Sequence, residues 1–348
     1  MIALDTMKAL VKTQRAPGLE LKRVPIPDVG ARDALVRVMA TSICGTDYHI
    51  YSWDVWSQDR INPPLIAGHE FAGEVIEVGR DVTHIQVGDH VSAETHIVCH
   101  HCAQCQLGAF HLCANTEIIG VDIDGAFAEY VAIPAENLWP NDPELDPGIA
   151  SSQEPLGNAV HTAFDGPVAA QRIAVTGCGP IGLMSVAVLK KCGAQQIIAT
   201  EVNAFRLNLA RRMGADVVIN PLEADVVSTV MELTDGGGVD GVLEMSGNPQ
   251  AINQGVKMLR PGGRISLLGV PAENEVTLDL SNDVIFKGLK VNGIAGRKMW
   301  ETWRNVRGLL AAGLDISPII THTLPLEEFE KGMELMASGN SGKIILTL

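Results

Sequence analysis

The sequence predicts an α/β protein of two domains, one β-rich and barrel-like and the other a doubly wound parallel sheet. Its 348 residues, 46% of them hydrophobic, suffice for about two domains with sizeable cores. From Arg172 to Gly296 strand patterns alternate with helical ones, which predicts a parallel sheet of six strands. Up to about Ser151, short β patterns punctuated by glycine and proline predict the β-rich domain.

The parallel sheet is expected to begin with a strand from Ile173 to Thr176. A glycine turn then leads into a helix with apolar residues from Ile181 to Leu189, and another helix is expected from Pro249 to Leu259. Further strands are expected in "QIIATEV", "ADVVIN", "GVDGVLEMSG", "GGRISLLGV" and "LKVNGIAG". Ligands of such a sheet bind at the carboxyl ends of its strands.

The β-rich domain is expected to include both ends of the chain. The segments "DALVRVMATSIC" and "AGEVIEVG" are typical of its strands. After Arg297 we expect the helices "MWETWRNVRGLLAAG" and "LEEFEKGMELMASG" and a closing strand, "KIILTL", that returns to the first domain. The predicted domains are therefore residues 1–151 with 297–348, and residues 152–296. Met7 is an alternative start, because the recognisable pattern begins with "MKALVK".

Charge and composition exclude several classes of partner. A formal net charge of −15 and a pI near 5.1, with scattered basic residues, disfavour nucleic acid and anionic membranes. No apolar run approaches the ~18 residues of a membrane span, and the N-terminus lacks the pattern of a secretory leader. Seven cysteines, an odd number, argue against a disulfide framework. We expect a cytoplasmic protein that acts on a small molecule.

Four cysteines in "VCHHCAQCQLGAFHLCAN" predict a structural zinc site in a lobe of residues 95–116. Tight C-x2-C turns let thiolates converge on one ion, and four sulfurs leave no open position for water or substrate. An iron–sulfur cluster is disfavoured because the ferredoxin run closes with C-x3-C-P, and unliganded thiols are the other alternative. The nearby histidines are expected at the surface. The four predicted ligands are Cys99, Cys102, Cys105 and Cys113.

A second metal constellation lies ahead of these cysteines. Cys44 stands in "SICGTDYHIY", His69 and Glu70 stand in "AGHEFAG", and Glu154 stands in "SSQEPLGN". One thiolate, one imidazole and one carboxylate with an open fourth position are the ligands of a catalytic zinc. Composition alone leaves the alternative that Cys44 is a small buried hydrophobe and His69 a core histidine.

The glycine turn predicts a dinucleotide site. Gly177, Gly179 and Gly182 form G-x-G-x-x-G between a strand and a helix, so that a pyrophosphate can approach the backbone at the helix N-terminus. Pro180 and Ile181 complete this turn. Glu201, after the next strand, is placed to accept from the ribose hydroxyls, which favours NAD over NADP.

Arg206 leaves a second interpretation open, because it could stack on adenine or meet a 2′-phosphate. The ends of the later strands are expected to line the same cleft, with plain turn chemistry as the alternative. These residues are Ser246, Gly247, Leu268, Gly269, Val270, Ile294 and Ala295.

The order of these motifs resembles the zinc-dependent medium-chain alcohol and polyol dehydrogenases along the entire chain. It runs C-G-T-D-x-H, G-H-E, G-D-x-V, four cysteines, E-P-L and G-x-G-P-x-G. The resemblance implies a GroES-like catalytic domain, a Rossmann domain, NAD, and one catalytic and one structural zinc per chain. Narrower matches such as "PLGNAVHTA" and "LEMSGNPQA" imply that the substrate is L-threonine, oxidised at C3 to 2-amino-3-oxobutyrate.

The resemblance also implies roles for single residues. It places the catalytic zinc on Cys44, His69 and Glu70, with Glu154 as an outer or exchanging ligand. Neighbouring side chains on a strand point to opposite faces, so His69 and Glu70 can share an ion only if the backbone bends there, and either acid could be the true ligand. The resemblance also implies that Thr46 and His49 form a proton relay. Asp47 is the implied partner that orients His69.

The sequence leaves alternatives open for the activity and for the assembly. A polyol or diol dehydrogenase with the same metal and relay, or a non-catalytic dinucleotide-binding zinc protein, are the alternatives. Glu94, His96 and Arg297 are candidates, from their positions, for binding the ammonium and carboxylate of an amino acid. The resemblance implies a homotetramer, although the sequence itself does not favour four subunits over two.

Overall fold

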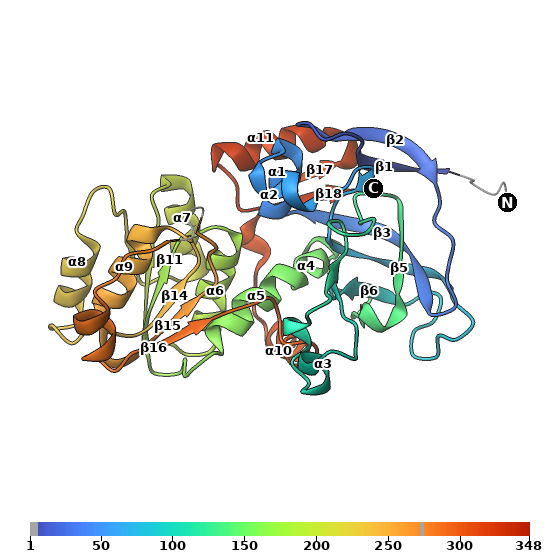
Figure 1. Cartoon of the computed structure of the whole chain (residues 1–348). Coiled ribbons are helices and arrows are strands. Elements are labelled where there is room, and N and C mark those ends of the chain that lie inside the picture. The colour runs from blue at the N-terminus through green and yellow to red at the C-terminus, as the bar shows by residue number, and fades with distance from the viewer. Residues whose placement is uncertain (1–5, 272–274) are drawn as a thin grey trace. The chain divides into compact units, whose positions relative to one another are not determined.

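The computed structural model describes residues 6–271 and 275–348, which form two compact units (Figure 1). Residues 1–5, which precede the alternative start at Met7, lie outside the described residues. In the described part of the chain, no helix is long and apolar enough to cross a membrane.

The first unit contains the β-rich architecture that the sequence predicts. It comprises Met1–Glu154, Ile320–Ser338 and Lys343–Leu348. Its described strands form sheets in the orders β2-β1-β4, β7-β8 and β10-β6-β5-β3-β18-β17, with β9 also paired to β3. The strands are β1 (Thr6–Lys12), β2 (Glu20–Pro25), β3 (Asp33–Ile43), β4 (Leu65–Ile66), β5 (Glu70–Val78), β6 (His90–Ala93), β7 (His96–Ile97), β8 (Glu117–Ile118), β9 (Tyr130–Pro134), β10 (Leu138–Pro140), β17 (Ile320–Pro325) and β18 (Lys343–Thr347).

The long strand β3 organises this unit. It pairs antiparallel with β5 and β9, and the C-terminal strand β18 joins it with Ile344 opposite Ile43. The expected closing strand therefore does return to the first domain. The helices of this unit are α1 (Gly45–Ser52), α2 (Val55–Arg60), α3 (Ala103–Gln106), α4 (Pro147–Ser151), α11 (Phe329–Ser338) and the short turns η1 (Phe110–Leu112), η2 (Ala135–Asn137) and η5 (Leu326–Glu328).

The second unit, Pro155–Ile319 with Gly339–Gly342, is the doubly wound domain. Its described strands are all parallel, in the order β13-β12-β11-β14-β15-β16, which is the Rossmann arrangement and confirms the predicted fold class. Helices α6 (Pro180–Lys191) and α9 (Pro249–Met258) pack on this sheet (Figure 1). The strands are β11 (Arg172–Thr176), β12 (Gln196–Thr200), β13 (Val217–Ile219), β14 (Val239–Glu244), β15 (Leu259–Leu267) and β16 (Lys290–Gly293).

The helices of the second unit extend beyond the predicted domain boundary at residue 296. Residues 297–319, expected in the first domain, belong to the second. The reason is packing: Arg297 donates to Asn158 on α5, and Lys191 at the end of α6 donates to the carbonyl of Ala312, just after α10. The helices are α5 (Gln153–Ala163), which begins in the first unit, α6 (Pro180–Lys191), α7 (Ala204–Met213), α8 (Val226–Leu233), α9 (Pro249–Met258), α10 (Glu301–Ala311) and the turns η3 (Leu280–Ile285) and η4 (Ser317–Ile319).

Candidate active site

Cys44 is held at the junction between β3 and α1. It is the N-cap of α1 in an extended conformation, and its backbone N–H donates to Oδ2 of Asp47 at 2.8 Å. This capping arrangement satisfies an N–H that the helix leaves free, and the Asp47 carboxylate that accepts from it is completely buried. The thiol of Cys44 and the second oxygen of Asp47 are thereby fixed in the same small region.

The backbone bends at His69 and Glu70, as a shared metal ion requires. Strand β5 begins at Glu70, so His69 still belongs to the preceding loop. Gly68 takes a positive φ of 91°, and a Cβ there would lie 2.2 Å from the Phe127 ring, so a side chain at this position is excluded. One ligand atom each of Cys44, His69 and Glu70 lie within 4.8 Å of one another.

The charges around these three residues suit a cation. Among the described residues, no hydrogen-bond partner meets His69 Nδ1, Asp47 Oδ1 or Glu70 Oε1, although all three atoms are buried. Burial disfavours a charged His69 ring, but Asp47 and Cys44 outweigh it and raise the pKa of His69. The buried, unpartnered Oε1 of Glu70, beside the Cys44 thiol and the His69 ring, fits a zinc site. His69 Nδ1 also lies 3.5 Å from Asp47 Oδ1, so Asp47 is placed to orient the ring.

The two candidate carboxylates occupy different places. Glu70 Oε2 is engaged by the Lys343 ammonium and the Ser42 hydroxyl, which leaves Oε1 for a metal. Glu154 lies in the first turn of α5, is buried, and accepts from Thr95 Oγ1 at 3.3 Å. Its carboxylate is not part of the three-residue cluster, so the geometry favours Glu70 as the nearer acid.

The expected relay residues lie on α1, just after Cys44. Thr46 Oγ1 is 4.0 Å from the Cys44 sulfur and is half-buried. His49 is one turn further along the helix, and its side chain is 55% exposed, so it can exchange protons with solvent. Its Nδ1 lies 2.6 Å from Oδ2 of Asp54, a residue that the sequence did not single out.

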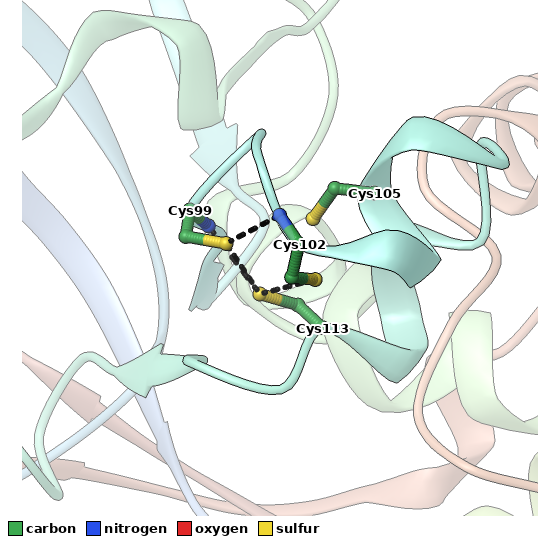
Figure 2. A group of neighbouring side chains, drawn as sticks. All are labelled: Cys99, Cys102, Cys105 and Cys113. Carbon is green, nitrogen blue, oxygen red and sulfur yellow. Dashed lines mark hydrogen bonds between the residues drawn. The ribbon is translucent and has the colours of Figure 1, made fainter.

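The four clustered cysteines converge as their spacing predicts (Figure 2). Their Sγ atoms all lie within 4.8 Å of one another, and the Sγ of Cys113 is 3.5 Å from that of Cys99 and 4.0 Å from that of Cys102. Backbone N–H groups of Cys99 and Cys102 also donate to sulfur. All seven cysteines of the chain are free of disulfides. This arrangement fits a closed four-sulfur zinc site.

Local hydrogen bonds already favour thiolates in part of this cluster. The side-chain amide of Asn115 and nearby backbone N–H groups lower the pKa of the Cys99 thiol to about 5. Burial raises the pKa of the Cys105 thiol to about 12. The neighbouring His100 and His101 are exposed, and their rings contact Glu136 and the Cys99 carbonyl.

The glycine turn of the second unit leaves space where a cofactor would need it. A Cβ on Gly177 would lie 2.8 Å from Ser246, and one on Gly182 would lie 2.0 Å from the Gly177 carbonyl oxygen. Both positions therefore require glycine. Nothing lies within 4 Å of a Cβ on Gly179, the N-cap of α6, among the described atoms. The backbone N–H groups at this open helix start suit a pyrophosphate.

Glu201 follows β12 and closes the same turn. Its Oε2 accepts from the Cys178 N–H at 2.9 Å, and its Oε1 accepts from Val202 and Asn203 at 2.8 and 3.0 Å. The carboxylate is therefore held beside the turn by three backbone N–H groups, and its contact with ribose stays a prediction. Arg206 Nε donates to the Ser341 carbonyl at 3.4 Å, so its head group is partly engaged within the unit.

The other candidate cofactor residues lie at carboxyl ends of parallel strands. The buried Glu244 ends β14 and accepts from Ser246 and Gly247 through its carboxylate, while its carbonyl accepts from Leu268 and Gly269. Ile294 follows β16 and donates to the Leu267 carbonyl at the end of β15. Val270 and Ala295 are exposed just beyond these strands.

The three substrate candidates are all involved in local contacts. Glu94 is buried, and its Oε1 lies 3.6 Å from His96 Nδ1 and 3.1 Å from the His96 N–H. Arg297 is 1% exposed and packs against α5 in the second unit. Sequence reasoning missed Ser42, Lys343 and Asp54. A lysine opening an apolar strand and an aspartate placed as an N-cap were the available signals.

Known families match both units of this chain. The family described as "Alcohol dehydrogenase GroES-like domain" matches residues 30–143, and "Zinc-binding dehydrogenase" matches residues 180–312. Fold, cysteine cluster and sequence together show that the chain belongs to the zinc-dependent medium-chain dehydrogenases.

Several relatives within this family are L-threonine 3-dehydrogenases. The L-threonine 3-dehydrogenase of Symbiobacterium thermophilum is 57% identical over 344 residues, 98% of each chain. That of Pyrococcus furiosus is 51% identical over 346 residues, 99% of each chain. Among solved structures, an alcohol dehydrogenase from Thermus sp. ATN1 has a TM-score of 0.90 at 31% identity and covers 98% of this chain and 99% of its own.

Proposed function

We propose that this chain oxidises the C3 hydroxyl of L-threonine and transfers hydride to NAD, which gives 2-amino-3-oxobutyrate and NADH in threonine catabolism. The observation that carries this proposal is its 50 to 57% identity with L-threonine 3-dehydrogenases along nearly the whole chain. The convergence of Cys44, His69 and Glu70 supports it.

The first unit supplies the groups that activate the alcohol. A zinc ion held by Cys44, His69 and a carboxylate would supply Lewis-acid chemistry that lowers the pKa of the substrate hydroxyl. Asp47 orients His69 for this ligation from 3.5 Å. Thr46 receives the hydroxyl proton and passes it towards His49, whose exposed ring releases it to solvent. Glu154, buried near the site, is proposed as an outer or exchanging ligand.

The second unit binds the cofactor, which supplies the hydride acceptor. The backbone at Gly177, Gly179 and Gly182 receives the pyrophosphate at the start of α6, with Pro180 and Ile181 in its first turn. Glu201 accepts from the ribose hydroxyls and repels a 2′-phosphate, which favours NAD. We propose that the strand ends line the rest of this site. The residues are Ser246, Gly247, Leu268, Gly269, Val270, Ile294 and Ala295, with Arg206 on the adenosine side.

NADH formation with L-threonine, compared with 2,3-butanediol and sorbitol, tests the proposal. We expect threonine to be the preferred substrate and about two zinc ions per chain by elemental analysis. Cys44→Ser should lose one zinc ion together with the activity. Turnover of the diols alone would replace the substrate, and NADH binding without any turnover would make the chain a non-catalytic zinc protein.

Glu94 and His96 are the proposed partners of the threonine ammonium and carboxylate in the first unit. An unpaired charged group in a closed site costs about 1–3 kcal/mol, so losing a true partner should raise the Michaelis constant for threonine roughly five- to 150-fold. Glu94→Ala tests this, with Arg297→Ala as the comparison from the second unit. An unchanged Michaelis constant would remove the residue concerned from the proposal.

We propose that the chain assembles into a cytoplasmic homotetramer. Strand β16 is an edge of the sheet in the described residues, and Val291 on it is exposed together with Ile285 and Phe286 nearby. An exposed apolar edge can pair with the same edge of a second copy about a twofold axis, and two such dimers form a tetramer. Light scattering of the native protein and of Val291→Lys tests this: a monomer in both would contradict it.

A further inference from the structure

The ring of His49 is hydrogen-bonded to the carboxylate of Asp54, which is held in place at the start of helix α2. Asp54 is the N-cap of α2, where its Oδ1 accepts from the Ser57 N–H at 3.0 Å. Its other oxygen, Oδ2, lies 2.6 Å from His49 Nδ1. Trp53 between them takes a positive φ of 60° and ends α1, so the chain turns back and brings Asp54 to the ring. The Asp54 carboxylate thus links the start of α2 to the His49 side chain on α1.

The charge state of Asp54 decides which nitrogen of His49 carries the proton. Burial opposes ionisation, but the Ser57 N–H and the His49 ring outweigh it, so the pKa of Asp54 is lowered. An ionised carboxylate only accepts hydrogen bonds, so Nδ1 must donate. In a neutral ring the lone pair then lies on Nε2, which is the nitrogen available to take a proton.

The contact between His49 and Asp54 orients the His49 ring more than it stabilises the fold. The His49 and Asp54 side chains are 55% and 37% exposed, and ion pairs this exposed contribute little to stability. In the described part of the chain, Asp54 is the acid paired with His49. The charged residues packed near α1 face other rings: Glu330 and Glu334 act on Tyr51, and basic residues of the N-terminal segment lie over Trp53.

We propose that Asp54 is a positioning residue of the proton relay, which holds the His49 ring through Nδ1 and leaves Nε2 to accept the proton. The inference rests on the proposed function, because it extends the relay by one residue. The proton that leaves the substrate hydroxyl moves to Thr46, which passes its own proton on towards Nε2 of His49. The doubly protonated ring then loses the Nε2 proton to solvent, and Asp54 stays ionised throughout.

Asp54→Asn separates this role from helix capping. Asparagine is an equally good N-cap, so α2 keeps its start, while the negative charge on His49 is lost. Asp225→Asn is a matched control, because Asp225 caps α8 in the second unit with the same contact, Oδ1 to the Ser228 N–H at 3.0 Å. We expect Asp54→Asn to lower kcat about tenfold, within the range of general acid–base effects. The Michaelis constant for threonine, the zinc content and the affinity for NADH should stay unchanged, as should all parameters of Asp225→Asn.

The same substitution in a His49→Gln background tests whether Asp54 acts through His49. There it should change kcat by less than about twofold, since the ring that it orients is gone. Equal losses in both backgrounds, or a kcat of Asp54→Asn like that of the wild type, would overturn the proposal. An inactive wild type would instead contradict the proposed function.

A readout independent of activity uses nitrogen-15 spectra of histidine-labelled protein, in which His49→Gln identifies the signal. The Nδ1-protonated form of His49 should dominate in the wild type and decrease in Asp54→Asn. An Nε2-protonated ring in the wild type would contradict the inference even if no substrate were turned over.

Discussion

Lys343 and Glu70 form a buried ion pair directly beside the candidate catalytic metal ligands. Glu70 is fully buried, Lys343 is 2% exposed, and the ammonium also donates to the Ile43 carbonyl at 3.1 Å. Burial disfavours the charged lysine, but the negative groups around it, with Glu70 the strongest, outweigh this and raise the pKa of Lys343. The pair joins the last strand, β18, to the first residue of β5.

Removing the ammonium should destabilise the first unit. Lys343→Met leaves the Glu70 carboxylate buried without its cation, which costs about 3–5 kcal/mol when one partner of a buried pair is lost. Denaturant unfolding followed by tryptophan fluorescence measures the change. Lys331→Met, which removes the exposed partner of Glu328, is the matched control and should change little. Equal stability of the two variants would contradict the structural role of Lys343.

Lys12 should stabilise the C-terminal end of α1, which carries His49. It is fully buried, its ammonium donates to the carbonyls of Ala16, Gly18 and Ile50, and it lies 4.6 Å from the centre of the Trp53 ring. Lys12→Met would leave these carbonyls without their donor, so we expect the free energy of unfolding to fall by about 1–3 kcal/mol. We also expect kcat to fall, since His49 lies in this last turn of α1.

Lys8→Met, which removes an exposed partner of Glu327, is the control for this variant. It should leave both the unfolding midpoint and kcat unchanged. If Lys12→Met behaved in the same way, Lys12 would have no role in holding the helix.

The cysteine lobe should hold its zinc independently of the catalytic site. Cys105→Ser replaces one of four thiolates, so the zinc content should fall by about one per chain, and the lobe of residues 95–116 should become protease-sensitive. The remaining zinc should still be lost on Cys44→Ser. Elemental analysis and limited proteolysis check this. Two zinc ions retained in Cys105→Ser would show that the four-sulfur site is not a zinc site.

Glu244 should make stability depend on pH and should order the cofactor turn. Burial raises the pKa of Glu244 above its ordinary value of 4.5, although Ser246 and Gly247 donate to it. Its folded-state pKa exceeds the unfolded one, so its contribution to stability is present below pH 4.5 and is lost as the pH rises through the raised pKa.

Glu244→Gln should therefore remove this part of the pH dependence. The stability of the wild type relative to the variant should decrease from pH 4 to pH 7, as measured by denaturant unfolding. The affinity for NADH should fall about fivefold, because the Gly247 N–H loses its acceptor, the second carboxylate oxygen, and with it a hydrogen bond of roughly 1 kcal/mol. If the difference in stability between the wild type and Glu244→Gln were the same at pH 4 and pH 7, the titration of Glu244 would be contradicted.

Local motifs carried most of what the sequence could predict. The six parallel strands, the glycine turn and the four-cysteine lobe each depend on residues that are close in sequence, so spacing alone specifies their geometry. Glu201 also lies beside the turn, since it stands at a fixed distance after the first strand, and its contact with ribose stays a prediction.

Contacts between distant segments could not be predicted. Nothing in "SGKIILTL" shows that Lys343 meets Glu70, which lies more than 270 residues earlier. The helix α10 was assigned to the wrong domain, because its amphipathic pattern shows that it is a helix but not what it packs against. His69 and Glu70 could share a site only because the chain bends after Gly68, where the Phe127 ring leaves no room for a side chain.

The central claim, hydride transfer from C3 of L-threonine to NAD, is tested most directly with threonine that carries deuterium at C3. The purified wild-type protein is incubated with NAD and this substrate, and the reduced cofactor is analysed by mass spectrometry. We predict NADH with one deuterium atom and a slower rate than with unlabelled threonine. Reduced cofactor without deuterium, or no reduced cofactor at all, would contradict the account.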